Sequence, residues 1–121
     1  MLIKNKIPFI NEDQTMKKAL KVINLKGLGF LVVTNSQGLT TGVFTDGDLK
    51  RLMRKSSKID NLKIKNFMSK KPFSVEENTL ASEVLSQMNK KKITNVCVFR
   101  KKNKQRTIGV LHIHDLLNNL R

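Results

Sequence analysis

Apolar residues recur along the chain with two different spacings. Pairs three or four residues apart, such as Leu20 with Ile23 and Val84 with Met88, are typical of amphipathic helices. Short apolar runs bounded by turn residues, such as "FLVV" and "NVCVF", are typical of buried strands. The predicted elements are, in chain order, an extended piece at 9–10, a helix at 15–26, strands at 30–33 and 39–44, a helix at 46–55, an extended piece at 73–75, a helix at 79–91, strands at 95–99 and 107–112, and a helix at 114–120.

Local signals support the ends of these elements. Thr15 and Thr79 precede the two longer helices and are their predicted N-caps. Leu80 is assigned to the apolar face of the second of these helices, and "NSQG" is the predicted turn between the first pair of strands.

The two halves of the chain repeat one order of elements. The stretch "PFINEDQTMKKAL" aligns with "PFSVEENTLASEV", 64 residues further on, and "GVFTDGDLKRL" aligns with "GVLHIHDLLNN" at a spacing of 67. Each half reads β-α-β-β-α, which predicts an α+β fold. Neither half is long enough to bury a good core alone. We therefore expect two units, residues 1–56 and 67–121, joined by a linker at 57–66, related by a pseudo-twofold axis and packed through their sheets.

Composition limits the class of protein. Hydrophobic residues make up 39% of the 121, which is enough for a folded core. No apolar run approaches the roughly 20 residues of a membrane span, and the start of the chain lacks the apolar region of a signal peptide. A single cysteine, Cys97, excludes a disulfide framework and is assigned to a buried strand. The predicted location is the cytoplasm, with no membrane partner.

The chain is strongly basic, with a net charge of +15 from 24 basic and 9 acidic residues. Such a charge attracts anions, including nucleotides, sugar phosphates, nucleic acid and acidic protein surfaces. The charges are spread over several predicted helices and loops, and the only aromatic residues are six Phe. Single-stranded nucleic acid is usually bound on aromatic platforms. This pattern favours solvated charged faces over a nucleic-acid groove.

The segment from Gly42 to Asp48, "GVFTDGD", combines a strand end, a polar turn and a helix start. Thr45 and Asp48 have the spacing of a capping box, which would only stabilise the helix. A threonine hydroxyl and the first N–H groups of a helix also suit a phosphate, and a carboxylate accepts hydrogen bonds from a ribose diol. Gly47 would permit the close approach of a ligand. The residues alone favour the cap, and both roles are compatible.

The repeat, the "FMSKKPFSV" stretch and the strand–"TDGD"–helix junction together resemble a tandem cystathionine-β-synthase-type (CBS) domain pair. The resemblance covers nearly the whole chain. Two longer stretches are similar to the CBS portion of bacterial D-arabinose-5-phosphate isomerases, namely "GLGFLVVTNSQGLTTGVFTDGDLKR" and "KKKITNVCVFRKKNKQRTIGVLHIHDLL". In that family "GxFTDGDLRR" and "GVLHxHDLL" recur. The resemblance implies a preceding sugar-isomerase (SIS) domain that carries catalysis, and a place in the synthesis of the lipopolysaccharide sugar Kdo. We expect this chain to be a part cut from such a longer protein.

The resemblance also implies which residues bind a ligand. In CBS pairs, nucleotides bind in clefts between the two halves through the pattern Gly-hydrophobic-x-Thr/Ser-x-x-Asp. The residues predicted in this way to contact a ligand are Thr45, Asp46, Asp48, Ile10, Val75, His112, His114 and Asp115.

Several of these assignments have a second interpretation. Apolar residues such as Phe9 and Phe73 would flank a base or belong to the core, and the core is favoured for Phe73. Lys92 and Arg100 would assist with a phosphate or remain solvated charges. In the second copy His112 replaces the threonine, so that a simple adenosine-phosphate site is in doubt there. His112 or His114 would instead contact an acidic ligand, most strongly when protonated.

The predicted function is regulatory binding of a nucleotide or nucleotide sugar, with AMP, ATP or CMP-Kdo as candidate ligands and no required cofactor. We expect a homodimer. The chain has no nucleophile elbow and no phosphate loop, so we expect no catalysis by this chain alone. His-x-His offers too few ligands for a metal site. Two other functions remain open, a purely structural dimerisation module and a basic nucleic-acid-binding domain.

Overall fold

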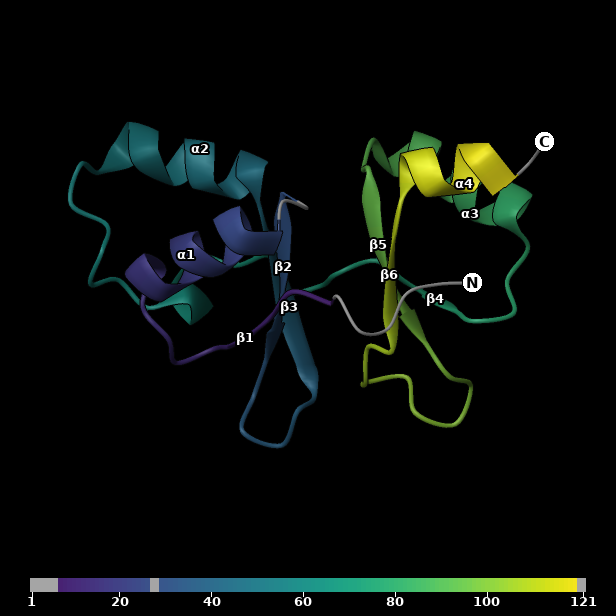
Figure 1. Ribbon diagram of the computed structural model, residues 1–121, viewed down its shortest axis with the longest axis horizontal. Coiled ribbons are helices and arrows are strands. Elements are labelled where there is room, and N and C mark those ends of the chain that lie inside the picture. The colour runs from purple at the N-terminus through teal and green to yellow at the C-terminus, as the bar shows by residue number, and fades with distance from the viewer. Residues whose placement is uncertain (1–6, 27–28, 120–121) are drawn as a thin grey trace. The chain divides into compact units, whose positions relative to one another are not determined.

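The computed structural model describes residues 7–26 and 29–119. Its contacts divide the chain into two compact units, a first unit that runs to Pro72 and a second unit that begins at Phe73. Each unit is built from one three-stranded sheet and two α-helices (Figure 1). The predicted α+β fold with two β-α-β-β-α repeats is confirmed. The predicted packing of the two sheets and the pseudo-twofold axis stay predictions.

The first unit contains six elements. They are β1 (Phe9–Asn11), α1 (Met16–Lys26), β2 (Phe30–Thr34), β3 (Thr40–Thr45), α2 (Asp46–Lys55) and a short 3-10 helix, η1 (Ile64–Asn66). The strand order is β1-β2-β3, with β1 parallel and β3 antiparallel to β2. A parallel pair needs a crossover connection, which α1 supplies. The predicted "NSQG" turn joins β2 to β3, where the Gly38 N–H donates to the Asn35 carbonyl at 3.0 Å.

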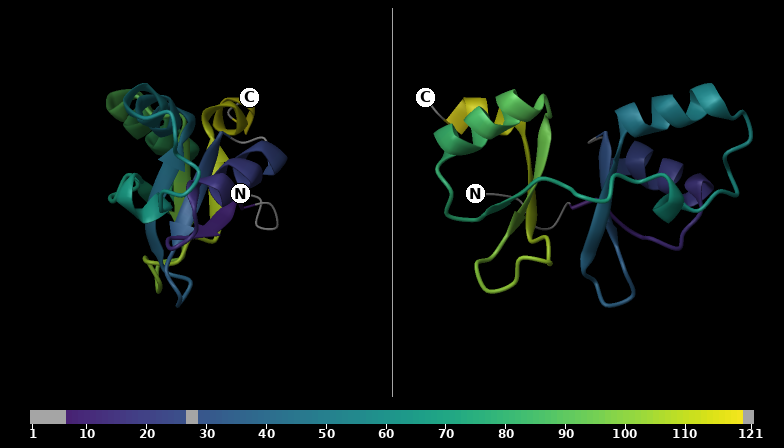
Figure 2. Two further views of the ribbon diagram at one scale, coloured as in Figure 1. Left: turned by 90° about the vertical axis from the view of Figure 1, so that its left-hand side faces the viewer. Right: turned by 180° about the vertical axis from the view of Figure 1, so that it is seen from behind.

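The core of the first unit lies between the sheet and the helices. Both α1 and α2 cover the same face of the sheet (Figures 1 and 2). The buried side chains of this core are Ile10, Met16, Ala19, Ile23, Leu31, Val33, Phe44, Leu52, Ile59 and Ile64. Thr15 is the N-cap that the sequence predicts, because its Oγ1 accepts a hydrogen bond from the Lys18 N–H at 3.3 Å.

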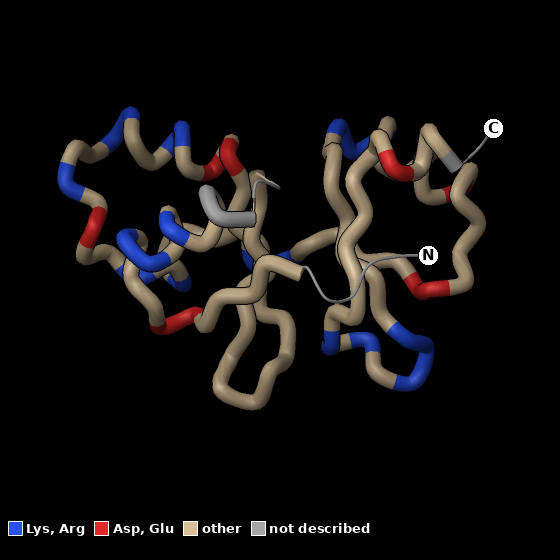
Figure 3. Tube along the Cα trace, viewed as in Figure 1, with Lys and Arg blue, Asp and Glu red and all other residues tan. Residues whose placement is uncertain are grey.

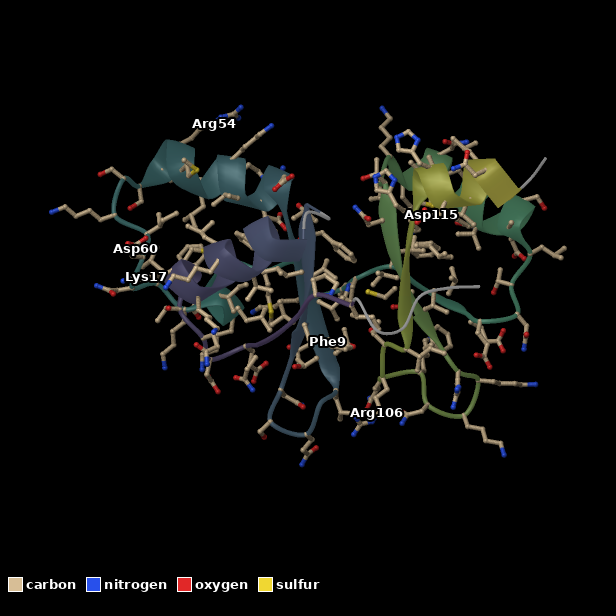
Figure 4. All side chains as sticks on the ribbon, viewed as in Figure 1. Phe9, Lys17, Arg54, Asp60, Arg106 and Asp115 are labelled. Carbon is tan, nitrogen blue, oxygen red and sulfur yellow. The ribbon has the colours of Figure 1, made fainter. Side chains whose placement is uncertain are left out.

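The segment predicted as a linker, 57–66, folds with the first unit. Its carbonyls satisfy the first N–H groups of α1, which have no partner inside the helix. The Met16 N–H donates to the Leu62 carbonyl at 2.7 Å, and the Lys17 N–H donates to the Asp60 carbonyl at 3.0 Å. Figure 4 shows Lys17 and Asp60 side by side. The predicted domain boundaries stay predictions, but residues 57–66 act here as a structural part of the first unit.

The second unit repeats the first five elements. They are β4 (Ser74–Glu76), α3 (Ala81–Lys91), β5 (Asn95–Phe99), β6 (Gly109–His112) and α4 (Ile113–Asn119), and residue 120 of the predicted last helix lies outside the described residues. The strand order is β4-β5-β6, again with one parallel and one antiparallel pair. The core consists of Val75, Val84, Leu85, Met88, Val96, Val98, Leu111 and Leu116.

Two predictions at the start of α3 are wrong. Leu80, not Thr79, is the N-cap, and it makes no side-chain capping hydrogen bond. The turn before α3 is fixed instead by Glu76, whose carboxylate accepts from the Asn78 N–H at 2.6 Å and whose carbonyl accepts from the Thr79 N–H at 3.0 Å. Because Leu80 precedes the helix, its side chain is 71% exposed and lies off the apolar face.

The single thiol is buried, and we expect it to be unreactive. Burial raises the pKa of Cys97 from 9.0 to about 11, and a hydrogen bond with Thr107 opposes that shift. The unfolded chain releases the thiol proton near pH 9.0, whereas the folded chain holds it until about pH 11. The stability that this group contributes is therefore fully present below pH 9.0 and is lost as the pH rises through about 11. At pH 8 the native protein should react with iodoacetamide roughly 100-fold more slowly than the urea-unfolded chain, because only the thiolate reacts. Equal rates, measured by mass spectrometry, would contradict the buried position.

Candidate functional site

The start of α2 carries the capping box that the sequence predicts. Thr45 has extended backbone angles, and its Oγ1 accepts from the Asp48 N–H at 3.1 Å. In return, Asp48 Oδ2 accepts from the Thr45 N–H at 3.0 Å. Two acidic side chains, Asp46 and Asp48, lie in the first turn, where the helix dipole favours negative charge. The capping role of Thr45 and Asp48 is therefore confirmed, while their contact with a ligand stays a prediction.

The Asp48 carboxylate is the centre of the polar contacts in this region. Its side chain is only 10% exposed, and its Oδ1 accepts from the Arg51 guanidinium at 2.6 Å. Ser69 Oγ lies 3.4 Å from Oδ2 and 3.5 Å from Oδ1. With Thr45, these contacts occupy much of the accepting capacity of the carboxylate. A ligand that hydrogen-bonds to Asp48 would have to replace Arg51 or Ser69.

The capping role of Thr45 predicts a specific loss of stability. Thr45→Ala removes the acceptor for the Asp48 N–H and should lower the free energy of unfolding by about 1 kcal/mol. Thr45→Ser keeps a hydroxyl at the same position and should cost much less. Urea denaturation followed by circular dichroism measures both variants. Equal losses would show that the hydroxyl does not cap α2.

Glycines near this helix start have different steric surroundings. Gly29 has a φ of +71°, and an added Cβ would lie 2.8 Å from the Asp46 carboxylate. The backbone N–H of Asp46 donates to the Gly29 carbonyl at 3.0 Å. At Gly42, a Cβ would lie 2.6 Å from the Ser69 carbonyl oxygen and 2.7 Å from Met68 Sδ. At Gly47, by contrast, the nearest atom would be 3.5 Å away, which is an ordinary contact. Within the described residues, the positive φ favours glycine at 29 and packing against backbone requires it at 42, whereas neither applies at 47.

The start of α4 is a modified copy of the same cap (Asp115 in Figure 4). The His112 N–H donates to Asp115 Oδ2 at 3.1 Å, as the Thr45 N–H does to Asp48. His112 Nδ1 accepts from the His114 N–H at 3.1 Å and so replaces the threonine hydroxyl. The two imidazole rings stack, with their centroids 4.8 Å apart. The structure thus brings His112, His114 and Asp115 together at one helix start.

Other predicted contact residues lie apart from these helix starts. Ile10 and Val75 belong to the cores of their own units and are 5% and 8% exposed, so little of either side chain is free for a ligand. Phe73 packs against the second core, as the core interpretation expects, and the Lys91 ammonium lies 5.1 Å from its ring centroid. Arg100 Nε lies 3.7 Å from Glu77 Oε2, which leaves a phosphate contact of Arg100 a prediction.

Charge and metal-binding groups give no further site in the described residues. Lys and Arg occur on α1, on α2 and in the loop between β5 and β6, rather than along one element (Figure 3). Among the described residues, no three His, Cys, Asp or Glu side chains gather as a metal site would require. Within the same residues, every helix is too short or too polar to cross a membrane.

Sequence reasoning missed two members of the first site, Arg51 and Ser69. Arg51 lies one helical turn after Asp48, and this i, i+3 spacing of opposite charges was a signal that could have identified the ion pair. Ser69 is 21 residues from Asp48, and no local pattern places the two together.

Two β-α-β-β-α units with related caps on their closing helices form a tandem architecture, and comparison with known proteins identifies its family. The CBS domain model matches residues 2–55 and 64–121. This chain therefore belongs to the CBS domain family and contains two copies of the domain.

The chain is also similar to curated proteins that are named as isomerases. It is 33% identical to arabinose 5-phosphate isomerase KdsD of Yersinia pestis over 111 residues, which are 92% of this chain and 33% of that protein. It is 33% identical to the protein of the same name from Escherichia coli K12 over 113 residues, which are 93% of this chain and 34% of that protein. The chain thus spans about a third of the length of these relatives.

Solved structures share the fold at low sequence identity. A CBS-domain protein from Agrobacterium tumefaciens has a TM-score of 0.85 at 19% identity, with 95% of this chain and 84% of that chain covered. The CBS pair of protein MJ0100, crystallised with 5′-methylthioadenosine and S-adenosyl-L-methionine, has a TM-score of 0.84 at 19% identity, with coverages of 99% and 95%. The cytosolic domain of the Mg²⁺ channel MgtE in complex with ATP has a TM-score of 0.77 at 18% identity, with coverages of 94% and 45%.

Proposed function

We propose that this CBS pair is the regulatory, non-catalytic part of an arabinose-5-phosphate isomerase. The observation that carries the proposal is the alignment with proteins of that name, which spans more than nine-tenths of this chain but only about a third of theirs. The remaining two thirds of such a protein would contain the sugar-isomerase (SIS) domain and its catalytic residues. In this proposal the protein acts in the cytoplasm, in the synthesis of Kdo for lipopolysaccharide.

The proposed ligand is a nucleotide or a nucleotide sugar. Two proteins of the same fold were crystallised with adenine nucleosides or nucleotides, MJ0100 and MgtE. In the first unit the start of α2 offers a nearly buried carboxylate and the first-turn N–H of Gly47, a glycine that packing does not require. These groups suit a ribose and a phosphate. AMP, ATP and CMP-Kdo are the candidate ligands, and no cofactor is needed.

Calorimetric titration tests this proposal. The chain is titrated with AMP, ATP, CMP, CTP and CMP-Kdo at moderate salt, well below its unfolding temperature. We expect one ligand to bind and its affinity to fall about tenfold or more in Asp48→Asn, because a hydrogen bond to a charged group is lost. Asparagine keeps an oxygen that accepts from the Thr45 N–H, so the cap of α2 survives.

The matched control is Asp115→Asn, which makes the same chemical change at the other helix start. A loss confined to one variant assigns the ligand to that half of the chain, and equal losses assign it to both. Absence of binding by every ligand, in protein shown by circular dichroism to be folded, would contradict the proposal.

A second candidate function is assembly without a ligand, as a homodimer. The closing helix of each unit exposes a large apolar side chain, Met53 on α2 at 59% and Leu117 on α4 at 49%. Contiguous exposed apolar patches mark contact surfaces between protein chains, and these two side chains would contribute to one in each unit. Sedimentation equilibrium that shows a concentration-dependent mass, together with no heat from any ligand, would favour this function.

A further inference from the structure

The two helix caps accept from different N–H groups, that of the third residue in α2 and that of the second residue in α4, and they differ in their response to protons. Thr45 caps α2 with a hydroxyl oxygen, which accepts a hydrogen bond at any ordinary pH. His112 caps α4 with Nδ1, which accepts from the His114 N–H at 3.1 Å. An imidazole nitrogen accepts only while it carries no proton. The neutral His112 ring must therefore carry its hydrogen on Nε2.

We propose that His112 makes the start of α4 sensitive to protons, because a proton on Nδ1 removes the acceptor for the His114 N–H. This inference concerns the second unit alone and does not depend on the proposed ligand. The His112 side chain is partly exposed and that of His114 is exposed, so solvent protons reach the pair. Histidine is the side chain whose charge most readily changes near neutral pH, and in this proposal protonation of His112 is the event that weakens the cap.

The charges around His112 act in opposite directions. A protonated ring would lie at the start of α4, where the helix dipole disfavours a cation, and against the stacked His114 ring. The Asp115 carboxylate favours the cation, but it already accepts from the His112 N–H at 3.1 Å. A protonated ring that turned toward Asp115 would compete with that hydrogen bond as well.

Neighbouring elements add few charges. On α3, which packs against α4, the charged residues are Glu83, Lys90 and Lys91, with Lys92 at its C-cap. The Lys91 ammonium lies over the Phe73 ring. The strand β5, which pairs with β6, has no charged residue, and its Cys97 thiol is buried. Asp115 favours a protonated His112 ring and the helix dipole disfavours it, so their effects on the free energy of unfolding oppose each other. The hydrogen bond from the His114 N–H is therefore the more direct quantity to measure.

Amide hydrogen exchange of His114 reports this hydrogen bond directly. The residue is the second of α4, where an N–H has no partner inside the helix. We expect its protection, corrected for intrinsic exchange, to fall about three- to tenfold between pH 7.5 and pH 5.5. The Asp48 amide, capped by Thr45, should keep its protection across this range and serves as the internal control.

Two variants identify the responsible ring. His112→Thr restores the Thr-x-x-Asp pattern of the first unit and should remove the pH dependence at α4. His114→Gln leaves the His112 cap in place and should retain it. A His114 amide with the same protection at both pH values, or a pH dependence that persists in His112→Thr, would overturn the inference.

A measurement on the unmodified chain covers the case in which a variant does not fold. The ¹⁵N chemical shifts of the His112 ring at pH 7.5 distinguish the two neutral tautomers. We expect an unprotonated Nδ1, and a proton found on Nδ1 at this pH would overturn the proposal.

Discussion

Phe44→Ala is expected to lower the free energy of unfolding of the first unit by about 3–5 kcal/mol. The Phe44 ring is completely buried, and it lies opposite Leu31 in the register of β2 and β3. Its core also contains Met16 from α1 and Ile64 from η1, so the cavity would open between the sheet and its helices. A close-packed interior of this kind relaxes only partly around a deleted ring. Urea denaturation followed by circular dichroism measures the loss.

Phe9→Ala is the matched control, because it removes the same ring from another strand of the same sheet. Phe9 is 44% exposed, so much of its surface is already in contact with water. We expect a loss well below that of Phe44→Ala. Similar losses for the two variants would contradict the position of the core on the helical side of the sheet.

Gly42→Ala is expected to be the next most damaging of these changes, with a loss of about 1–3 kcal/mol. The added Cβ would lie 2.6 Å from the Ser69 carbonyl oxygen, which is a backbone atom and cannot turn away. This oxygen accepts from the Val43 N–H at 3.0 Å, and the Ser69 N–H donates to the Val43 carbonyl at 2.8 Å. Relief of the clash would therefore break a pair of hydrogen bonds at the edge of β3.

Gly47→Ala separates this clash from the general effect of replacing a glycine. The nearest atom to a Cβ at Gly47 would be 3.5 Å away, and the residue lies in the first turn of α2. Alanine is the better helix former by about 1 kcal/mol, so this variant should be neutral or more stable. A loss at position 47 equal to that at position 42 would rule out the steric explanation.

The order of elements could be predicted because it rests on local signals that occur twice. Helical spacing, apolar strands and turn residues each act over a few neighbouring positions, and the alignment of the halves supports every assignment a second time. The cap of α2 could be predicted for the same reason, since Thr45 and Asp48 are three residues apart. In α3 a threonine alone was the signal, without an acidic residue three positions later, and it failed because Glu76 fixes the preceding turn and the helix starts past Thr79.

The segment between the repeats could not be predicted, because its contacts are distant in the sequence. Ile59 and Ile64 show neither helical nor strand spacing, yet both are buried in the first core. Ser69 reaches Asp48 through a backbone pairing with Val43 that no local pattern indicates. The contact between Ser69 and Asp48 therefore depends on the path of residues 57–72, which the sequence does not indicate.

The duplicated segment of this chain and its folding unit have different boundaries. The CBS matches separate the copies between residues 55 and 64, and the sequence repeat predicts a linker at 57–66. The first copy nevertheless depends on residues beyond that boundary, since Asp60 and Leu62 cap α1 and Ser69 covers the edge of β3. Any exchange of single copies between related tandem proteins would have to carry residues 57–72 with the first copy. Within the described residues, the segment that follows the first copy therefore belongs to the fold of that copy.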